Sequence, residues 1–214
     1  MRRRKQRRRQ SPCQFVKSVD RNHTLVQCHM PLWKTSQDPS NNQTLSSLNT
    51  RAVNMDAAKR LWLNGCNASD HTLKSSDALL TIGNTVYLIE FKAGIRNVNA
   101  QTPKNVHEHE IREKMLSSIL MLSDLTGRTC KEMRGHIEYL YVLSSQNNMH
   151  AHMRRKSQKK QCGADEHEIA GKERSVDTFL YKYKGVFFRE AHVLSGTGFD
   201  RFIREQLRTS GLRG

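Results

Sequence analysis

Two short apolar runs that flank a turn signal form the clearest pattern in this chain. Residues 78–82 (ALLTI) and 86–91 (VYLIEF) each have the length of a β-strand, and Gly83-Asn84 between them readily supplies the positive φ of a tight turn. This pattern predicts a β-hairpin. Both runs are nearly continuous in apolar residues rather than alternating, so we expect the hairpin to lie inside a sheet that is covered on both faces.

Helical spacing dominates the segment that follows. Residues 106–125 carry apolar side chains three and four positions apart, and Gly127 follows as a stop signal. The pattern predicts a helix that packs into the core. Its apolar positions are Ile111, Met115, Leu116, Ile119, Leu120, Leu122 and Leu125.

The rest of the C-terminal half alternates between strand and helix patterns. Residues 136–145 (HIEYLYVLSS) predict another buried strand. Residues 175–184 predict a helix, 186–195 a strand, and 198–207 a terminal amphipathic helix. The polar, charged stretch at about 146–174 lacks a core pattern, so we expect it to loop out of the sheet.

Upstream of the hairpin the pattern is weaker. Residues 51–64 (RAVNMDAAKRLWLN) predict a helix that ends at Gly65. Residues 11–50 are rich in Ser, Asn, Gln and Thr, and they offer at most one short strand. The positions expected on the inward face of the helix are Val53, Ala57 and Leu61, with Ala58 and Trp62 as further candidates.

Length and composition indicate one domain with additional segments. A chain of 214 residues with 36% hydrophobic content can bury one domain's core and leave tails over. We place that domain at 51–214, with a basic loop insertion at about 146–174. Residues 1–50 are expected to form a basic and polar N-terminal extension of uncertain order.

The charge of the chain points to a polyanionic partner. The formal net charge is +16, which favours nucleic acid over a membrane surface. Seven of residues 2–9 are Arg or Lys, and this run predicts a disordered arm that binds phosphates or serves as a targeting signal. The sequence shows no apolar stretch typical of a secretory signal or a transmembrane span, so we expect a cytoplasmic or nucleoid-associated protein with no membrane contact.

Several other activities lack their sequence signals. The five cysteines form no C-x-x-C pair and leave an odd count, which favours reduced thiols over a disulfide framework. The histidines do not have the spacing of a zinc site. Neither a Gly-rich phosphate loop nor a G-x-S-x-G elbow occurs, which argues against hydrolysis of a nucleotide triphosphate by this chain alone.

Candidate chemistry lies on the predicted hairpin. Asp77 stands at the entry to its first strand, while Glu90 and Lys92 are two positions apart on the second and so point to the same face. Carboxylates and lysines are rarely buried without partners. Three of them at the edge of an apolar hairpin require a shared ion or a mutual salt bridge.

Metal binding is the functional interpretation of this trio. Two converging carboxylates raise each other's pKa unless a hard divalent cation neutralises them, and Mg²⁺ prefers oxygen ligands. A neighbouring lysine can orient an attacking water or stabilise charge on a phosphate. The alternative is structural, with Asp77 as a turn former and with Glu90 and Lys92 paired on a solvated edge.

The hairpin resembles that of a known nuclease superfamily. The string SSDALLTIGNTVYLIEFKAG is similar to the core of the PD-(D/E)xK nucleases, in which an Asp opens one strand and the next strand ends in E-x-K. The resemblance implies an α/β fold with a central mixed sheet of four to five strands, flanked by helices in the order αβββαβ. It also implies Asp77 and Glu90 as ligands of Mg²⁺, for which Mn²⁺ can substitute, and Lys92 as the catalytic lysine.

Two further site residues follow from the same resemblance. The helix after E-x-K often carries a Lys or Gln directed at the active site, and Lys114 matches that position, with Glu110 as a second choice. The alternative is a Glu110–Lys114 ion pair on the helix surface. The superfamily also places a Glu on its first helix, where this chain offers Asp56 as the available third metal ligand. Asp56 is equally an ordinary residue for the first turn of a helix.

These expectations describe a metal-dependent nuclease, with DNA favoured over RNA as its substrate. The alternative is a protein of nuclease fold with an incomplete metal site that binds nucleic acid or a partner. The oligomeric state is left open, a homodimer included. A basic cluster in the loop at 146–174 either is solvated or grips a nucleic-acid backbone, and its members are Arg154, Arg155, Lys156, Lys159 and Lys160.

Overall fold

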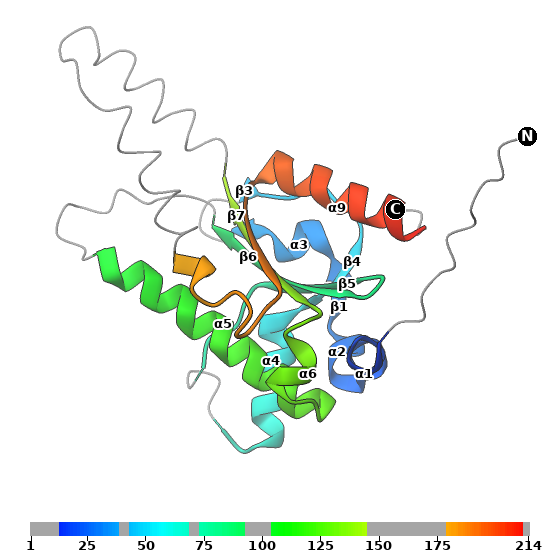
Figure 1. Cartoon of the computed structure of the whole chain (residues 1–214), viewed down its shortest axis with the longest axis vertical. Helices are drawn as coiled ribbons and strands as arrows, with labels where there is room; N and C mark the ends of the chain where they lie inside the picture. The colour runs from blue at the N-terminus through cyan, green and yellow to red at the C-terminus, as the bar shows by residue number, and fades with distance from the viewer. Residues whose placement is uncertain (1–12, 39–42, 69–72, 93–103, 145–178, 212–214) are drawn as a thin grey trace, which may run out of the picture.

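A six-stranded open mixed sheet forms the centre of the protein, with helices on both of its faces (Figure 1). The computed structural model describes residues 13–38, 43–68, 73–92, 104–144 and 179–211. In the order in which they pair, the strands of the sheet are β1 (His29–Pro31), β4 (Arg51–Asn54), β5 (Ala78–Ile82), β6 (Thr85–Lys92), β7 (Ile137–Leu143) and β8 (Glu190–Ser195).

The pairing of neighbouring strands changes from antiparallel to parallel at β6. Neighbours from β1 to β6 are antiparallel, whereas β6, β7 and β8 are parallel. A parallel neighbour requires a crossover, and helix α5 (Lys104–Thr126) lies between β6 and β7 in the chain. The predicted hairpin is confirmed, because β5 pairs with β6: Ala78 lies opposite Ile89 at one end, and Ile82 lies opposite Thr85 at the other. Gly83, in the turn between them, has a φ of +60°.

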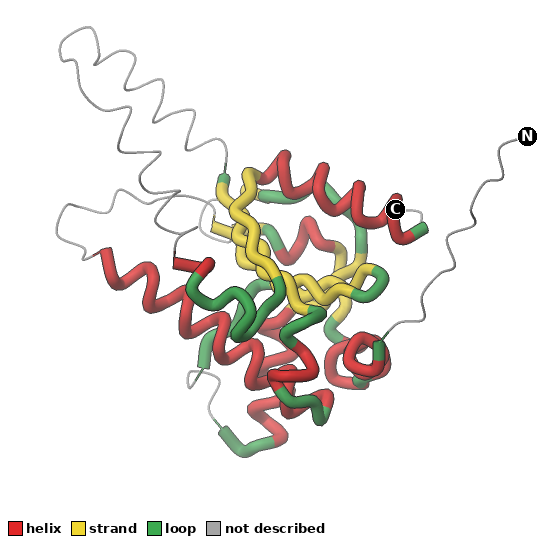
Figure 2. The backbone as a smooth tube through the Cα atoms, in the orientation of Figure 1, coloured by secondary structure: helices red, strands yellow, loops and turns green. Residues whose placement is uncertain are grey.

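Each face of the sheet buries a separate apolar core. On one face, Leu88 and Tyr139 belong to a cluster that includes residues of α1 (Gln14–Arg21), α4 (Met55–Gly65) and α5. On the other, Tyr87 and Leu140 pack with residues of α3 (Leu32–Thr35) and α9 (Gly196–Ser210). Figure 2 shows the strands enclosed between these helices. Burial on both faces explains why the strands are continuous apolar runs. The smaller elements are α2 (His23–Gln27), β2 (Gln37–Asp38), β3 (Gln43–Thr44) and α6 (Cys130–Met133).

The described part of the segment at 1–50 belongs to this fold, which differs from the expected extension of uncertain order. Helix α1 buries Phe15, Val16 and Val19, and the Cys13 N–H donates to the Asn84 side chain at the hairpin turn, 2.9 Å away. Strand β1 adds an edge to the sheet and brings the strand count to six, above the four to five expected. The helices and the edge strand here are three to eight residues long. Helix α1 does have an apolar face, formed by Phe15, Val16 and Val19, whereas α2, β1 and α3 are too short to show a periodic pattern.

The predicted helix over 51–64 is wrong at its start. Residues 51–54 form strand β4, and the Asn54 side chain accepts from the Ala57 N–H at 2.8 Å as the N-cap of α4. The core order is therefore β4-α4-β5-β6-α5-β7, where the resemblance implies αβββαβ. The buried positions of α4 are Met55, Ala58 and Leu63, whereas Leu61 is exposed.

The predictions for the C-terminal half hold for the long elements and fail in the connection between them. Helix α5 and strand β7 match 106–125 and 136–145, although Leu116 and Leu120 on α5 are exposed. The strand expected over 186–195 begins only at Glu190. Aromatic residues before it pack against the core from turns, so their apolar run does not indicate a strand.

The ends of the predicted C-terminal helices also differ from the structure. Of the helix expected over 175–184, residues 179–181 are helical, 182–184 are not, and the remainder lies outside the described residues. The terminal helix expected over 198–207 runs from Gly196 to Ser210. It begins two residues early because Ser195 caps it, its side chain accepting from the Gly198 N–H at 3.1 Å.

A close backbone approach fixes α9 against the chain that precedes β4. A Cβ added to Gly196 would lie 2.6 Å from the carbonyl oxygen of Leu45. The Asp200 carboxylate accepts from the Ser46 hydroxyl at 2.7 Å and from the Ser47 hydroxyl at 2.6 Å. The backbone at 45–47 is therefore held against the first turns of α9, which cover one face of the sheet.

Gly196→Ala tests this approach. The added methyl collides with a backbone atom that cannot rotate away, so we expect the free energy of unfolding to fall by about 1–3 kcal/mol. The measurement is urea unfolding followed by circular dichroism. Gly65→Ala is the matched control, because a Cβ there meets nothing within 4 Å and alanine favours a helix. Equal stability of the two variants would contradict the assigned contact.

Candidate functional site

The predicted site residues of the hairpin lie where β5 begins and β6 ends. Asp77 immediately precedes β5, and its N–H donates to the Ile89 carbonyl at 3.0 Å. Its carboxylate oxygen Oδ2 accepts from the Phe91 N–H at 2.6 Å. Two hydrogen bonds from one residue to the end of β6 therefore hold Asp77 beside Glu90, although 13 positions separate them in the sequence.

A single lysine from α5 contacts both carboxylates. The Lys114 amine lies 2.7 Å from Oε1 of Glu90 and 3.4 Å from Oδ1 of Asp77. The Glu90 side chain is only 2% exposed and that of Lys114 is 17% exposed, so these charges are shielded from water. A buried ion pair is stable only when its geometry compensates for the lost hydration.

One oxygen of this cluster lacks a hydrogen-bond partner. Oε2 of Glu90 is buried and accepts no hydrogen bond within the part of the chain that the structure describes. Leaving a buried acceptor unpartnered costs about 1–3 kcal/mol, and more when the group is charged. The site therefore holds one more carboxylate oxygen than its donors satisfy.

The surroundings shift the acid–base equilibria of all three groups. Burial raises the pKa of Glu90 to about 8, with a further contribution from the Asp77 carboxylate, while Lys114 opposes the rise. Burial also raises the pKa of Asp77, against the opposing effects of Lys114 and the Phe91 N–H. For Lys114, burial lowers the pKa, but Glu90 and Asp77 outweigh it and raise the pKa above its ordinary value. When both carboxylates are ionised, the cluster has one positive charge for two negative ones.

Two ion pairs connect strand β6 to helix α5. Glu90 and Lys92 are two apart on β6, and Glu110 and Lys114 are four apart on α5, so each pair projects from one face of its element. Lys92 contacts Glu110, with Nζ 3.4 Å from Oε2, while Lys114 contacts Glu90. The alternative of a Glu110–Lys114 surface pair is not the arrangement found, because each residue pairs with the strand.

Lys92 lies at the solvent-facing side of the cluster. Its side chain is 30% exposed. Burial raises the pKa of both Glu90 and Glu110, and the positive charge of Lys92 opposes that rise at each of them. At Glu110, Lys92 acts together with Lys114 and Lys74, and their combined effect outweighs burial. Net, the pKa of Glu110 is lowered. Lys92 is therefore close enough to act on the Glu90 carboxylate electrostatically and accessible enough to meet a bound phosphate.

Serines preceding β5 fix the position of α5. The Ser118 hydroxyl accepts from the Ser76 N–H at 2.8 Å and lies 2.7 Å from the backbone carbonyl of Lys114, to which it donates. Further out, Lys74 contacts Glu113 at 3.0 Å. Sequence reasoning missed these contacts, for which the Ser75-Ser76-Asp77 run was the available signal, since polar residues just before a buried strand need partners.

Asp56 lies in the first turn of α4, near the cluster but outside its hydrogen bonds. Its Oδ1 accepts from the Ser75 hydroxyl at 2.7 Å and lies 3.7 Å from the Lys59 amine, and its side chain is 54% exposed. Its charge contributes to the raised pKa of Asp77, behind the larger effect of burial. Asp56 is thus within electrostatic range of Asp77 without contacting Glu90 or Lys114.

The donor set fits a small divalent cation in its chemistry. Asp77 and Glu90 present hard oxygen ligands at one point, and Oε2 of Glu90 has no hydrogen-bond partner among the described residues. In the described residues no group of three or more His, Cys, Asp or Glu side chains is placed to hold a metal. Mg²⁺ usually keeps several waters and binds through one or two carboxylates, so two ligands suffice for such a site.

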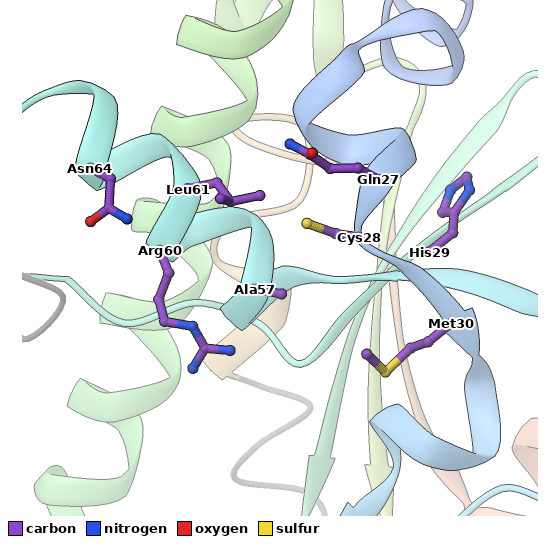
Figure 3. Close-up of a pocket in the computed structure, with 8 residues that line it drawn as sticks. All are labelled: Gln27, Cys28, His29, Met30, Ala57, Arg60, Leu61 and Asn64. Carbon is purple, nitrogen blue, oxygen red and sulfur yellow. The ribbon is translucent and has the colours of Figure 1, made fainter.

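The remaining predicted contacts are placed elsewhere. The basic cluster formed by Arg154, Arg155, Lys156, Lys159 and Lys160 lies outside the described residues. A separate open groove of about 470 Å³ lies between α4 and the α2–β1 segment (Figure 3). None of Asp77, Glu90, Lys92 or Lys114 lines it, so it is distinct from the carboxylate cluster. Its lining residues are Gln27, Cys28, His29, Met30, Ala57, Arg60, Leu61 and Asn64.

Comparison with known proteins adds no assignment. No family model, curated protein or solved structure matches the chain. Within the described residues, none of the helices combines the length and the apolar character needed to cross a bilayer. The case for a function therefore rests on the geometry of the site.

Lys114→Met tests whether Lys114 compensates for the two carboxylates. Removing one partner of a buried pair leaves uncompensated charge, so we expect the free energy of unfolding at pH 7 to fall by about 3 kcal/mol. Adding Glu90→Gln should recover part of this loss, because the buried side chain at position 90 then no longer has to take up a proton or hold an uncompensated charge. The measurement is urea unfolding without divalent metal.

Lys92→Met is the control for that substitution. It breaks a more exposed and longer ion pair, so its cost should be below about 1 kcal/mol. If Lys92→Met and Lys114→Met cost the same, the Lys114 amine does not have the central role assigned to it.

Proposed function

We propose that this chain is a Mg²⁺-dependent phosphodiester hydrolase that acts on nucleic acid, with Mn²⁺ able to substitute. The observation that carries the proposal is the pair of carboxylates, Asp77 and Glu90, which share one lysine amine while a buried Glu90 oxygen has no partner among the residues that the structure describes. A purely structural cluster gains nothing from an unsatisfied carboxylate. In a site that receives a cation, the unsatisfied carboxylate oxygen is available as a ligand.

The architecture supports the same proposal. A hairpin carrying Asp77 and the E-x-K residues, a crossover helix carrying Lys114, and a parallel strand follow in the order that the resemblance to the PD-(D/E)xK nucleases implies. Strand β4 departs from that order, since it precedes α4 instead of following it. We infer a restriction-endonuclease-like core with this rearrangement, and the resemblance favours DNA as the substrate.

The residues divide the chemistry among them. Asp77 and Glu90 hold the cation, which when bound supplies Lewis-acid polarisation of a phosphate oxygen and lowers the pKa of water. Lys92, at the accessible side of the cluster, donates to a phosphate oxygen or orients the attacking water. Glu110 positions Lys92 by accepting a hydrogen bond from its amine. The Lys114 amine contacts the phosphate after this amine has left the carboxylates of Asp77 and Glu90.

Charge supports a nucleic-acid substrate. Outside residues 2–9, seven of which are Arg or Lys, the chain still carries +9, and this excess favours a phosphate backbone as partner. The preference for DNA rests on the resemblance alone.

A second function is favoured by one observation. Lys114 already supplies a counter-charge to Asp77 and Glu90, and Asp56 contacts Ser75 and Lys59 rather than the two carboxylates. A protein that kept the fold and lost its metal would retain this arrangement, with Lys114 as a permanent counter-ion. It would bind nucleic acid or a partner without cleaving it.

Cleavage assays separate the two functions. We expect supercoiled plasmid and single-stranded DNA to be cut in Mg²⁺ or Mn²⁺, and chelator to abolish cutting. Asp77→Asn, Glu90→Gln and Lys92→Met should each lower the rate by about 10²-fold or more, because each removes a group that acts on the transition state. Glu190→Gln is the control, since Glu190 pairs with Lys184 away from the site.

The two outcomes differ sharply. Cleavage that survives both Asp77→Asn and Lys92→Met would contradict the assigned site. Binding of DNA without cleavage in either metal would establish the second function instead.

Binding to nucleic acid is expected to weaken steeply with salt. A protein that neutralises Z phosphates loses affinity with a slope of about −0.9Z in a plot of log K against log salt concentration. Fluorescence anisotropy of a labelled duplex between about 50 and 200 mM salt measures the slope. A slope near zero would show that the basic excess of the chain is not used to contact phosphates.

A further inference from the structure

We propose that Lys114 is an exchangeable counter-cation that occupies the metal position and leaves it when a substrate phosphate arrives, so that metal binding and nucleic-acid binding reinforce each other. The inference deepens the proposed function and rests on it. In this proposal Lys114 controls when the metal binds to Asp77 and Glu90, in addition to contacting the phosphate.

The geometry places the amine where a divalent cation would have to bind. Nζ lies 2.7 Å from Glu90 and 3.4 Å from Asp77, and so occupies the point where their carboxylates converge. A cation that uses the same oxygens of both side chains cannot share that point with an ammonium group. Metal binding at these oxygens therefore requires the amine to move.

The surroundings allow that movement. The hydrogen bonds of Ser118 hold the α5 backbone at Lys114, so the helix stays in place while the side chain reorients. The side chain is 17% exposed, and a lysine has a flexible four-carbon stem with rotatable donors. Its amine can thus exchange one anionic partner for another without unfolding the site.

The charge balance decides when the exchange is favourable. Asp77, Glu90 and Glu110 contribute three negative charges when ionised, against two positive charges from Lys92 and Lys114. A divalent cation replacing Lys114 at the carboxylates leaves a buried ammonium without a partner. A substrate phosphate supplies that partner, and a phosphate is a good acceptor for a lysine amine.

Reciprocal coupling follows from this exchange. If nucleic acid draws Lys114 away from Asp77 and Glu90, it must raise the affinity for metal, and metal must raise the affinity for nucleic acid by the same factor. Without substrate, Lys114 competes with the metal. The chain would then carry little metal until it is bound to nucleic acid.

Mn²⁺ binding tests the proposal without relying on cleavage. Free Mn²⁺ is measured by electron paramagnetic resonance in titrations of the full chain at about 0.15 M salt, where distant surface charges are screened. Lys114→Gln removes the competing charge, so we expect it to bind Mn²⁺ at least about tenfold more tightly than the wild type. Lys74→Gln is the control, because it removes a lysine charge at the rim, where it pairs with Glu113.

A second measurement uses the wild-type chain and a variant together. A short duplex with phosphorothioate linkages, chosen to slow cleavage, should tighten Mn²⁺ binding by the wild type and should tighten it much less in Lys114→Gln. The wild-type titration needs no substitution, so it remains informative if Lys114→Gln does not fold, which circular dichroism checks.

Asp77→Asn separates failure of this proposal from failure of the proposed function. If Asp77→Asn abolishes Mn²⁺ binding and Lys114→Gln strengthens it, the exchange is supported. If Asp77→Asn abolishes binding but neither Lys114→Gln nor the duplex strengthens it, the exchange is overturned and the metal site stands. If Mn²⁺ binding does not depend on Asp77, both proposals are overturned.

Discussion

The buried contact between Glu90 and Lys114 is the interaction on which the candidate site depends. It places an ammonium 2.7 Å from a carboxylate that is only 2% exposed, and the same ammonium serves Asp77 at 3.4 Å. Burial takes the Glu90 carboxylate out of water and the neighbouring Asp77 carboxylate repels it, so the pKa of Glu90 rises to about 8 although Lys114 opposes the rise. When both carboxylates are ionised, the cluster carries one positive charge for two negative ones, and the proposed cation would supply the difference.

The rest of the architecture keeps that contact in register. Glu90 sits on β6, in the middle of a sheet that has an apolar core on each face, so the strand cannot shift without exposing both cores. Helix α5 is fixed to the segment before β5 through Ser118 and Ser76, and to α4 through the Trp62 indole, which donates to Asp124 at 2.6 Å. Packing and polar contacts thus set the strand–helix register that pairs Glu90 with Lys114.

Sequence patterns were reliable where a single element was long and uniform. The hairpin, α5 and β7 could be read from their apolar runs because burial on one or both faces leaves a periodic or continuous signal. The same reasoning failed at residues 51–54, which were predicted as helix and form a strand. It also failed within residues 11–50, where α2, β1 and α3 are too short for a period and the apolar face of the eight-residue α1 was missed. At both places tertiary packing, not local preference, decides the conformation.

By itself the sequence determined which chemical groups meet on the hairpin. A tight turn at Gly83 and the alternation of side chains along β6 fix the positions of Asp77, Glu90 and Lys92, because these are local constraints. Only the tertiary structure decided which lysine faces the carboxylates. Lys114 is 24 residues beyond Glu90, and its place depends on how α5 packs across the sheet, so Lys114 takes the inner position and Lys92 pairs with Glu110 at the rim.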